Sequence, residues 1–257
     1  MFKDEIQAVA GAAAGKKKLL ENNPLGYFLL SMLAGIYVGI GVLLAFTVGG
    51  YLSAAGSPMV KIAMGLSFGV ALSLVVMAGA ELFTGNNMVM AVGTMKKTVT
   101  LGDSIKLWVV CWIGNLAGAL VLAVLFALAG LATGDVGTFM ATSAATKMNL
   151  PFVALLVRGI LCNFLVCAAV WCGTKMKTEG GKLLMIFWCL FAFITTGFEH
   201  SIANMTLLAI GLINPAGAAV SVGGYVYNLV VATLGNMIGG ILFIAVPYVI
   251  AAKDKQK

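Results

Sequence analysis

Charged residues divide the sequence into six long apolar stretches. The stretches cover residues 26–50, 62–92, 107–133, 150–173, 183–212 and 225–252. A helix of about 20 apolar residues crosses the hydrocarbon core of a bilayer. The pattern therefore predicts an all-α integral membrane protein, in which residues 26–252 form a bundle of six spans and residues 1–257 form a single transmembrane domain.

The second and fifth stretches are longer than one plain helix requires, and both contain the same polar pattern. Residues 79–86 read GAELFTGN and residues 197–204 read GFEHSIAN, so each copy has the form G-x-E-x-x-x-x-N. Ionisable groups inside membrane spans are costly and usually mark a substrate path. We therefore expect two broken helices, interrupted near the midplane and facing one site.

A second match relates the two halves of the chain. Residues 114–119 of the third stretch read GNLAGA, and residues 235–240 of the sixth stretch read GNMIGG. Both matches occur in the same order, and three spans per half make the halves enter the membrane from opposite sides. The sequence thus predicts an inverted 3+3 repeat with its site between the halves.

The composition agrees with a membrane location and excludes other classes of protein. Hydrophobic residues make up 61% of the 257 residues and charged residues only 10%. The net charge of +7 does not indicate a nucleic-acid partner, because the lysines fall between the apolar stretches rather than along one face. The 5 cysteines fit no zinc-binding spacing and there is 1 histidine, so we expect neither a metal site nor a cofactor.

The distribution of basic residues predicts the orientation. Residues 2–20 carry apolar side chains at helical spacing followed by three lysines, which indicates an amphipathic helix on the cytoplasmic surface; a frayed basic tail is the alternative. With both termini in the cytoplasm, most lysines lie on the inner side and the outer loops carry only Lys61 and Lys147. We therefore expect a multi-pass protein of the inner cell membrane.

Polar residues at both predicted breaks suit an interrupted helix. Thr84 and Asn86 follow the first carboxylate and Asn204 follows the second, and such side chains can satisfy backbone groups that a break leaves free. Half-helices that begin at the midplane would direct N–H groups toward an anion. We expect Glu81 and Glu199, together with Asn86 and Asn204, to support the structure; cation binding or proton relay by the carboxylates is the alternative.

Three cationic or titratable residues are further candidates. His200 is the only histidine and lies at the second break, where either protonation form can hold or protonate a weak-acid anion. Lys147 lies in an expected outer loop, residues 134–149, where it can attract anions to a pore mouth or stay a solvated loop lysine. Arg158 lies inside the fourth stretch, where it can extend to the interface or pair with one of the two carboxylates.

Two other functions are disfavoured. Asn214-Pro215-Ala216 is a triplet that water channels use at half-helix starts, but such channels need two copies and this sequence has one. A turn before the sixth stretch accounts for the triplet. An intramembrane enzyme is disfavoured because no nucleophile or metal-ligand cluster accompanies Glu199 and His200.

Three segments resemble signature motifs of the formate/nitrite transporter family. They are residues 76–85 (VMAGAELFTG), 159–167 (GILCNFLVC) and 197–205 (GFEHSIANM). The resemblance covers essentially the whole chain and is greatest to the hydrosulfide-channel branch. It implies an aquaporin-like protomer of six helices, a homopentamer in the lipid bilayer, and one pore through each protomer.

The resemblance also implies roles for individual residues. Thr84, His200 and Asn163 would form the pore centre, and Lys147 would draw anions inward. The residues that match two flanking apolar constrictions are Phe68, Leu72, Leu82, Phe83 and Phe193. If the register differs by one residue, Ile194, beside Phe193, would shape the outer constriction. Apolar rings exclude hydrated ions and pass species that can shed water or charge.

The implied substrates are small monovalent anions of the hydrosulfide, formate and nitrite class. Hydrosulfide is the first choice, because the resemblance is greatest to the hydrosulfide-channel branch. Its conjugate acid is significant near neutral pH, which makes hydrosulfide physically plausible but does not select it. Proton-coupled transport of formate or nitrite is the alternative.

Overall fold

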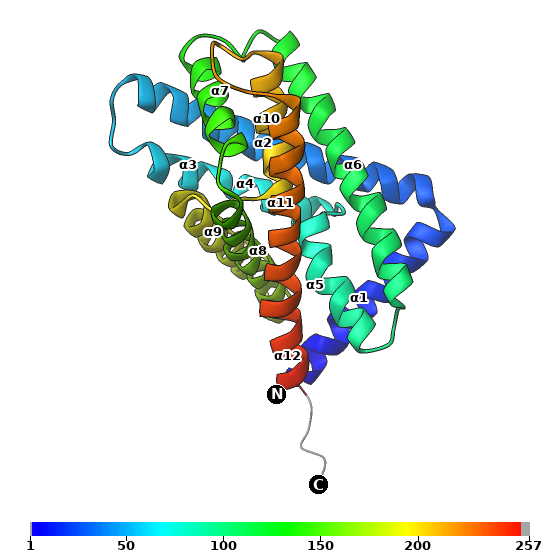
Figure 1. The fold of residues 1–257 in the computed structure, drawn as a ribbon. Helices are drawn as coiled ribbons and strands as arrows, with labels where there is room; N and C mark the ends of the chain where they lie inside the picture. Colours follow the sequence, from blue (N-terminus) through cyan, green and yellow to red (C-terminus); the bar gives the residue numbers. More distant parts are fainter. Residues whose placement is uncertain (1, 253–257) are drawn as a thin grey trace.

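The computed structural model describes residues 2–252, and all regular structure in this part of the chain is helical (Figure 1). The helices are, in chain order, α1 (Lys3–Asn22), α2 (Pro24–Ala54), α3 (Val60–Phe68), α4 (Val70–Ala78), α5 (Phe83–Met95), α6 (Leu101–Leu128), α7 (Gly134–Met148), α8 (Phe152–Lys175), α9 (Glu179–Thr196), α10 (Ser201–Ile213), α11 (Val222–Gly240) and α12 (Val246–Ala251), with a π-helical turn at Ile241–Ala245 before α12.

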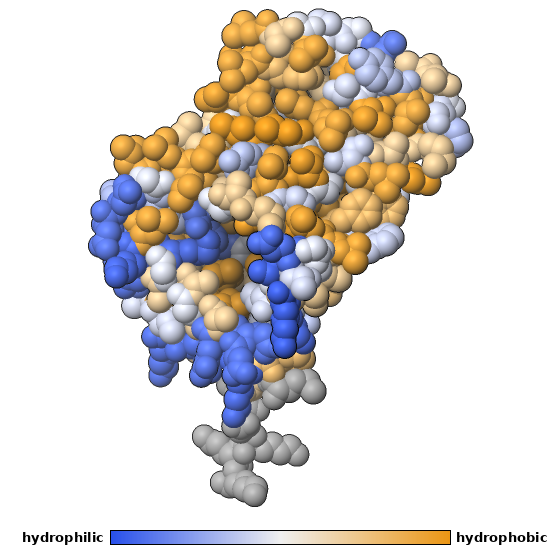
Figure 2. Space-filling view, turned by 180° about the vertical axis from the view of Figure 1, so that it is seen from behind, coloured by the Kyte–Doolittle hydropathy of each residue, from blue (hydrophilic) through white to orange (hydrophobic). Residues whose placement is uncertain are grey.

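Within residues 2–252, six helical segments are long and apolar enough to cross a membrane. They are α2, α3 continued by α4, α6, α8, α9, and α11 continued through α12. Apolar side chains cover much of the surface, whereas hydrophilic side chains gather at the end that holds α1 and α12 (Figure 2). A broad apolar surface of this kind fits lipid rather than water. The predicted all-α fold with six membrane spans is confirmed.

Glycines determine how closely the long helices pack. A Cβ at Gly35 of α2 or Gly118 of α6 would collide with the backbone of the facing helix, and a Cβ at Gly235 or Gly239 of α11 would collide with α8. The pairs α2–α6 and α8–α11 are also the most extensively packed helix pairs. Small residues allow this close approach of helix backbones in membranes. The two Gly-Asn motifs therefore lie at equivalent packing positions in the two halves.

Each G-x-E-x-x-x-x-N motif interrupts its span at the glycine. α4 ends before Gly79 and α5 begins at Phe83, while α9 ends before Gly197 and α10 begins at Ser201. Gly79 and Gly197 have φ angles of 78° and 82°, a left-handed conformation that strains residues with a Cβ. Both predicted breaks are present but begin earlier than expected, because the glycine ends the helix. The polar residues assigned to the breaks lie instead in the first turns of α5 and α10.

Asn115 of α6 satisfies the backbone at the first break. Its Oδ1 accepts a hydrogen bond from Phe83 N at 3.0 Å, and its Nδ2 donates to the carbonyl oxygens of Ser31 at 2.7 Å and Glu81 at 2.9 Å. The first N–H groups of a helix have no acceptor within the helix itself. One buried side chain thus supplies that acceptor and also joins α6 to α2 and to the break.

Asn236 of α11 makes the same contacts at the second break. Its Oδ1 accepts from Ser201 N at 2.9 Å, and its Nδ2 donates to the carbonyl oxygens of Gly159 at 2.8 Å and Glu199 at 2.9 Å. The two asparagines therefore contact equivalent atoms in the two halves. This agreement supports the predicted repeat, while the inverted orientation of the halves across a membrane stays a prediction.

Two shorter segments complete the comparison with the sequence predictions. The expected outer loop, residues 134–149, is largely the helix α7, because Val136, Met140 and Ala144 recur at helical spacing and are buried against the bundle. The predicted N-terminal helix is present as α1 and packs on α5, so the frayed-tail alternative is wrong.

The Asn-Pro-Ala triplet follows α10 and leads into a turn, as predicted.

Replacing Asn236 with Leu should lower the stability of the protein. The change leaves the buried Ser201 N–H without its acceptor and removes the donor to two carbonyl oxygens, and an unpaired buried group costs about 1–3 kcal/mol. The thermal midpoint in detergent, measured by fluorescence-detected size exclusion, should fall clearly. Asn149→Leu is the matched control, since Asn149 donates at 2.8 Å to Ala145 O at an exposed helix end. Equal midpoints for the two variants would contradict the role assigned to Asn236.

Candidate functional site

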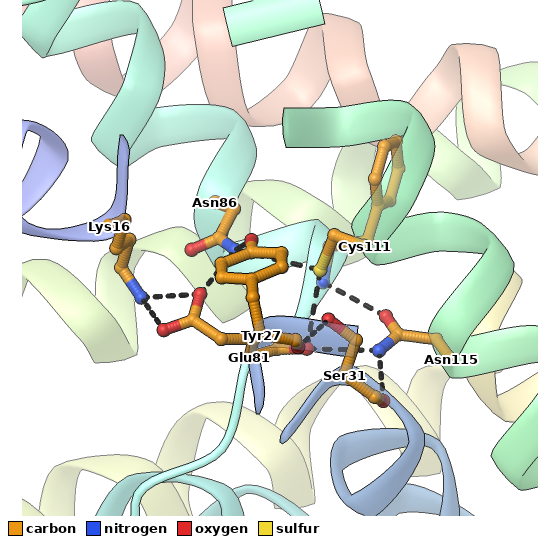
Figure 3. A network of polar contacts seen from close by, with 8 residues as sticks. Lys16, Tyr27, Ser31, Glu81, Asn86, Cys111 and Asn115 are labelled. Atoms are coloured by element: carbon orange, nitrogen blue, oxygen red, sulfur yellow. Dashed lines mark hydrogen bonds and ion pairs between the residues drawn. The ribbon is translucent and has the colours of Figure 1, made fainter. Parts of the chain in front are cut away.

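The carboxylate of Glu81 is held by a cation from the N-terminal helix (Figure 3). Lys16 Nζ of α1 lies 2.7 Å from both carboxylate oxygens. Asn86 Nδ2 donates to Glu81 Oε2 at 2.8 Å and to the Tyr27 hydroxyl oxygen at 3.2 Å. Glu81 is 8% exposed, so its charge lies largely out of solvent. Buried carboxylates need such pairing, because removing an unpaired charge from water is costly.

The carboxylate of Glu199 has an equivalent set of partners. Lys147 Nζ of α7 lies 2.7 Å from Oε1, and Asn204 Nδ2 donates to Oε2 at 2.7 Å. The same Asn204 Nδ2 also donates at 2.8 Å to Asn228 Oδ1. Glu199 is 2% exposed. Each broken span therefore carries a buried carboxylate bound by one lysine and by the asparagine five residues later.

The ion pairs revise the interpretation of the basic residues. Lys147 is half-buried and paired with Glu199, so the alternative of a solvated loop lysine is wrong. The sequence interpretation missed Lys16 as a functional residue, although a second buried carboxylate in a repeat requires a second cation. Arg158 pairs with neither carboxylate: its backbone oxygen accepts from Glu199 N at 3.2 Å, and within residues 2–252 its guanidinium makes no ion pair.

His200 and Thr84 bring the two half-helices together. Thr84 Oγ1 in the first turn of α5 lies 3.1 Å from His200 Nε2, which precedes α10. His200 Nδ1 accepts from Ala203 N at 3.0 Å, so Nδ1 carries no proton in this arrangement. The neutral ring therefore bears its proton on Nε2 and donates it toward the Thr84 oxygen. The Thr84 hydroxyl keeps its own proton available for another acceptor.

Asn163 of α8 binds the backbone next to the Thr84–His200 pair. Its Nδ2 lies 3.2 Å from Thr84 O, 3.1 Å from Asn87 Oδ1 and 2.7 Å from Asn236 O. Asn163 is fully buried and ties α8 to α5 and α11. Its side chain thus fixes the position of the Thr84 backbone and is not among the residues that line the cavities described next.

Three cavities follow one another past the two breaks. The α1-side cavity, about 570 Å³, is bordered by Lys16, Glu81 and Lys182. The α7-side cavity, about 410 Å³, is bordered by Lys147 and Glu199 among others. Between them lies a central cavity of about 10 Å³ with His200 in its wall. Such a volume is roughly that of one water molecule, so the centre has no room for a hydrated ion.

Apolar side chains separate the central cavity from the other two. Phe68 and Phe193 border both the central and the α7-side cavity, with ring centroids 5.6 Å apart. Leu72 and Leu82 border both the central and the α1-side cavity. Four of the residues matched to constrictions therefore lie where the cavities narrow.

The remaining residues of the predicted constrictions lie elsewhere. Phe83 is buried and borders none of these three cavities; its backbone N–H is the group that Asn115 binds. Ile194 borders the α7-side cavity, next to Phe193. The Phe193 ring stacks on the His200 imidazole with centroids 5.9 Å apart. One aromatic ring thus contacts both the constriction and the polar centre.

This arrangement can remove the hydration shell of a small solute and let the bare solute pass. Lysine–carboxylate pairs border the two wide cavities, apolar side chains separate these from the central cavity, and His200 borders the centre with its Nε2 bonded to Thr84. Within residues 2–252, the His, Cys, Asp and Glu side chains form no group that could hold a metal ion.

Comparison with known proteins agrees with the geometry. A family model described as formate/nitrite transporter matches residues 4–250. The nitrite transporter NirC of Salmonella typhimurium is 40% identical over 259 residues, which cover 100% of this chain and 94% of that protein. The formate channel BtFdhC of Bacillus thuringiensis is 32% identical over 249 residues, which cover 95% of this chain and 92% of that protein.

Solved structures show the same fold. An FNT family ion channel has a TM-score of 0.93 and 37% identity, with 98% of this chain and 100% of that chain covered. A pentameric formate channel with formate bound has a TM-score of 0.77 and 26% identity, with 89% of this chain and 98% of that chain covered. The chain therefore belongs to the formate/nitrite transporter family of multi-pass membrane transporters and channels for small anions, and it is not an enzyme.

Proposed function

We propose that each protomer carries small monovalent anions of weak acids, with nitrite as the leading substrate. The observation that carries the proposal is the central cavity, which two apolar constrictions enclose and into which His200 faces while bonded to Thr84. Relatives named nitrite transporter are 40% and 41% identical over nearly the whole chain, which supports nitrite.

Hydrosulfide and formate are the other candidates. Hydrosulfide, which the sequence motifs favour, has a conjugate acid that is populated near neutral pH. A relative named formate channel and a solved formate channel with formate bound support formate. All three share one chemistry, because each is a small anion that becomes neutral by accepting a single proton.

We propose further that the anion crosses the centre together with a proton. The two lysines nearest the breaks stand outside the constrictions, each bound to a carboxylate. The centre itself offers neutral donors, since His200 Nδ1 already accepts a backbone hydrogen bond. A bare anion in a dry apolar medium costs on the order of tens of kcal/mol, and protonation removes that cost.

The assembly and orientation belong to the same proposal. A pentameric structural relative supports a homopentamer with one pore in each protomer. The lysine-rich end that holds α1 and α12 suits the cytoplasmic face of the inner cell membrane, with both termini inside. In that orientation the α1-side cavity opens inward and the α7-side cavity opens outward.

Flux in purified proteoliposomes tests the proposed function. Nitrite, formate, hydrosulfide, acetate and chloride are compared across pH, and osmotic water flow is measured in the same vesicles by stopped flow. We expect fast flux of the three small weak-acid anions, slower acetate and little chloride. Water flow without anion flux would instead support a neutral-solute channel and overturn the proposal.

Replacing His200 with Asn should change the pH dependence of nitrite flux. Wild-type flux should rise as the external pH falls, because passage requires protonation of the anion. The shorter amide cannot keep both the Ala203 and the Thr84 contacts, so the rise should flatten. Thr84→Ser retains the hydroxyl and should keep the wild-type profile. An unchanged profile in the His200→Asn protein, with assembly intact, would show that the histidine has only a structural role.

Replacing Lys147 with Met should destabilise the protein, because it leaves Glu199 buried without a cation. Breaking a buried ion pair in this way costs about 3–5 kcal/mol. Adding Glu199→Gln to the same chain should restore much of the lost thermal midpoint. Lys61→Met removes an exposed cation of the same cavity and serves as the control. A single Lys147 variant as stable as this control would refute the importance of the pair.

A further inference from the structure

The charges around the two wide cavities match one another with a single exception. Lys147 and Glu199 of the α7-side cavity correspond to Lys16 and Glu81 of the α1-side cavity, because in each case the lysine Nζ lies 2.7 Å from the carboxylate at the break. Lys61 borders the α7-side cavity from the first turn of α3, the start of the first broken span. Lys182 likewise borders the α1-side cavity from the first turn of α9.

Arg158 is the exception, and the hydrogen bonds identify its counterpart. Glu199 N donates to Arg158 O at 3.2 Å, just as Glu81 N donates to Leu30 O at 3.2 Å. The asparagine contacts agree with this assignment, since they fall on the next residue in each half, Gly159 or Ser31. The α7-side half thus carries an arginine where the other half carries a leucine.

The backbone of Arg158 is fixed while its side chain is available. Its carbonyl oxygen binds the break beside His200, and the neighbouring Gly159 packs against the backbone of α11. The side chain is exposed and borders the α7-side cavity. Within residues 2–252, the guanidinium makes no hydrogen bond or ion pair. A fixed backbone position therefore presents an unpaired guanidinium to the cavity that Phe68 and Phe193 also border.

We infer that Arg158 is an anion-capturing subsite of the α7-side cavity, specific for anions that offer two coplanar oxygens. A guanidinium donates two parallel hydrogen bonds to such an anion, whereas an ammonium acts as a point charge. Formate and nitrite have this shape and hydrosulfide does not. The subsite rests on the proposed function, and it makes the two faces of the protein unequal: anions are captured more readily from the α7 side.

Transport measured from each side tests the inference. Arg158→Leu copies the residue of the other half, and nitrite and formate flux are measured in right-side-out and inside-out membrane vesicles. The concentration for half-maximal flux from the α7 side should rise about fivefold, the scale of one lost exposed charge contact. The same concentration from the α1 side, and the maximal rate, should stay as in the wild type.

Two further variants make the result specific. Arg158→Lys keeps the charge. Compared with Arg158→Leu, measured for all three anions, it should lower the concentration for half-maximal flux more fully for hydrosulfide than for nitrite or formate. Lys106→Leu removes an exposed cation that borders neither cavity and should change nothing. Size exclusion confirms that each variant remains assembled, and Arg158→Gln replaces the Leu variant if the latter does not fold.

The outcomes separate the inference from the proposed function. If the wild type carries the anions but the Arg158 variants show the same concentration for half-maximal flux, or an equal change from both sides, the subsite alone is overturned. Wild-type vesicles that carry none of the three anions would overturn the proposed function and the subsite with it. Equal rescue of all three anions by Arg158→Lys would show attraction by charge without recognition of shape and would contradict the stated specificity.

Discussion

The structure depends on how it satisfies backbone groups at two helix breaks inside an apolar medium. Lipid offers no hydrogen bonds, so a spanning helix can break only where protein supplies the missing partners. Asn115 and Asn236 do so, each with one acceptor and two donated hydrogen bonds. Because both side chains also reach the neighbouring span, the break, the packing of the long helices and the position of the centre depend on the same contacts.

The buried carboxylates add a second layer to this arrangement. Glu81 and Glu199 bind no backbone N–H of the half-helices; they accept hydrogen bonds from asparagine side chains and pair with lysines from α1 and α7. The lysine of each pair borders a wide cavity and does not border the central one. Charged groups thus stand in the two wide cavities, whereas the central cavity is bordered by apolar side chains and by His200. This division suits a solute that changes its charge on the way.

Much of the fold could be predicted from the sequence, because six apolar stretches and two repeated motifs are local signals. The importance of Thr84 and His200 was also accessible, because they differ between otherwise similar motifs and they meet across the two half-helices. His200 borders the central cavity, whereas Thr84 borders none of the three cavities, so its place in a pore centre stays a prediction. The partner of Glu81 was not accessible, since Lys16 lies 65 residues away within a run of three lysines that reads as a membrane-surface signal. Likewise, Phe83 shares the apolar character of pore residues, and only its packing shows that it borders none of the three cavities.

The proposed passage of the anion together with a proton, through a neutral centre, can be measured. The most direct test is nitrite uptake into proteoliposomes whose membrane potential is set with potassium and valinomycin, while a trapped dye reports internal pH. We expect the lumen to acidify in proportion to nitrite uptake, at an uptake rate that is independent of the membrane potential. Uptake that follows the potential without internal acidification would contradict the proposal.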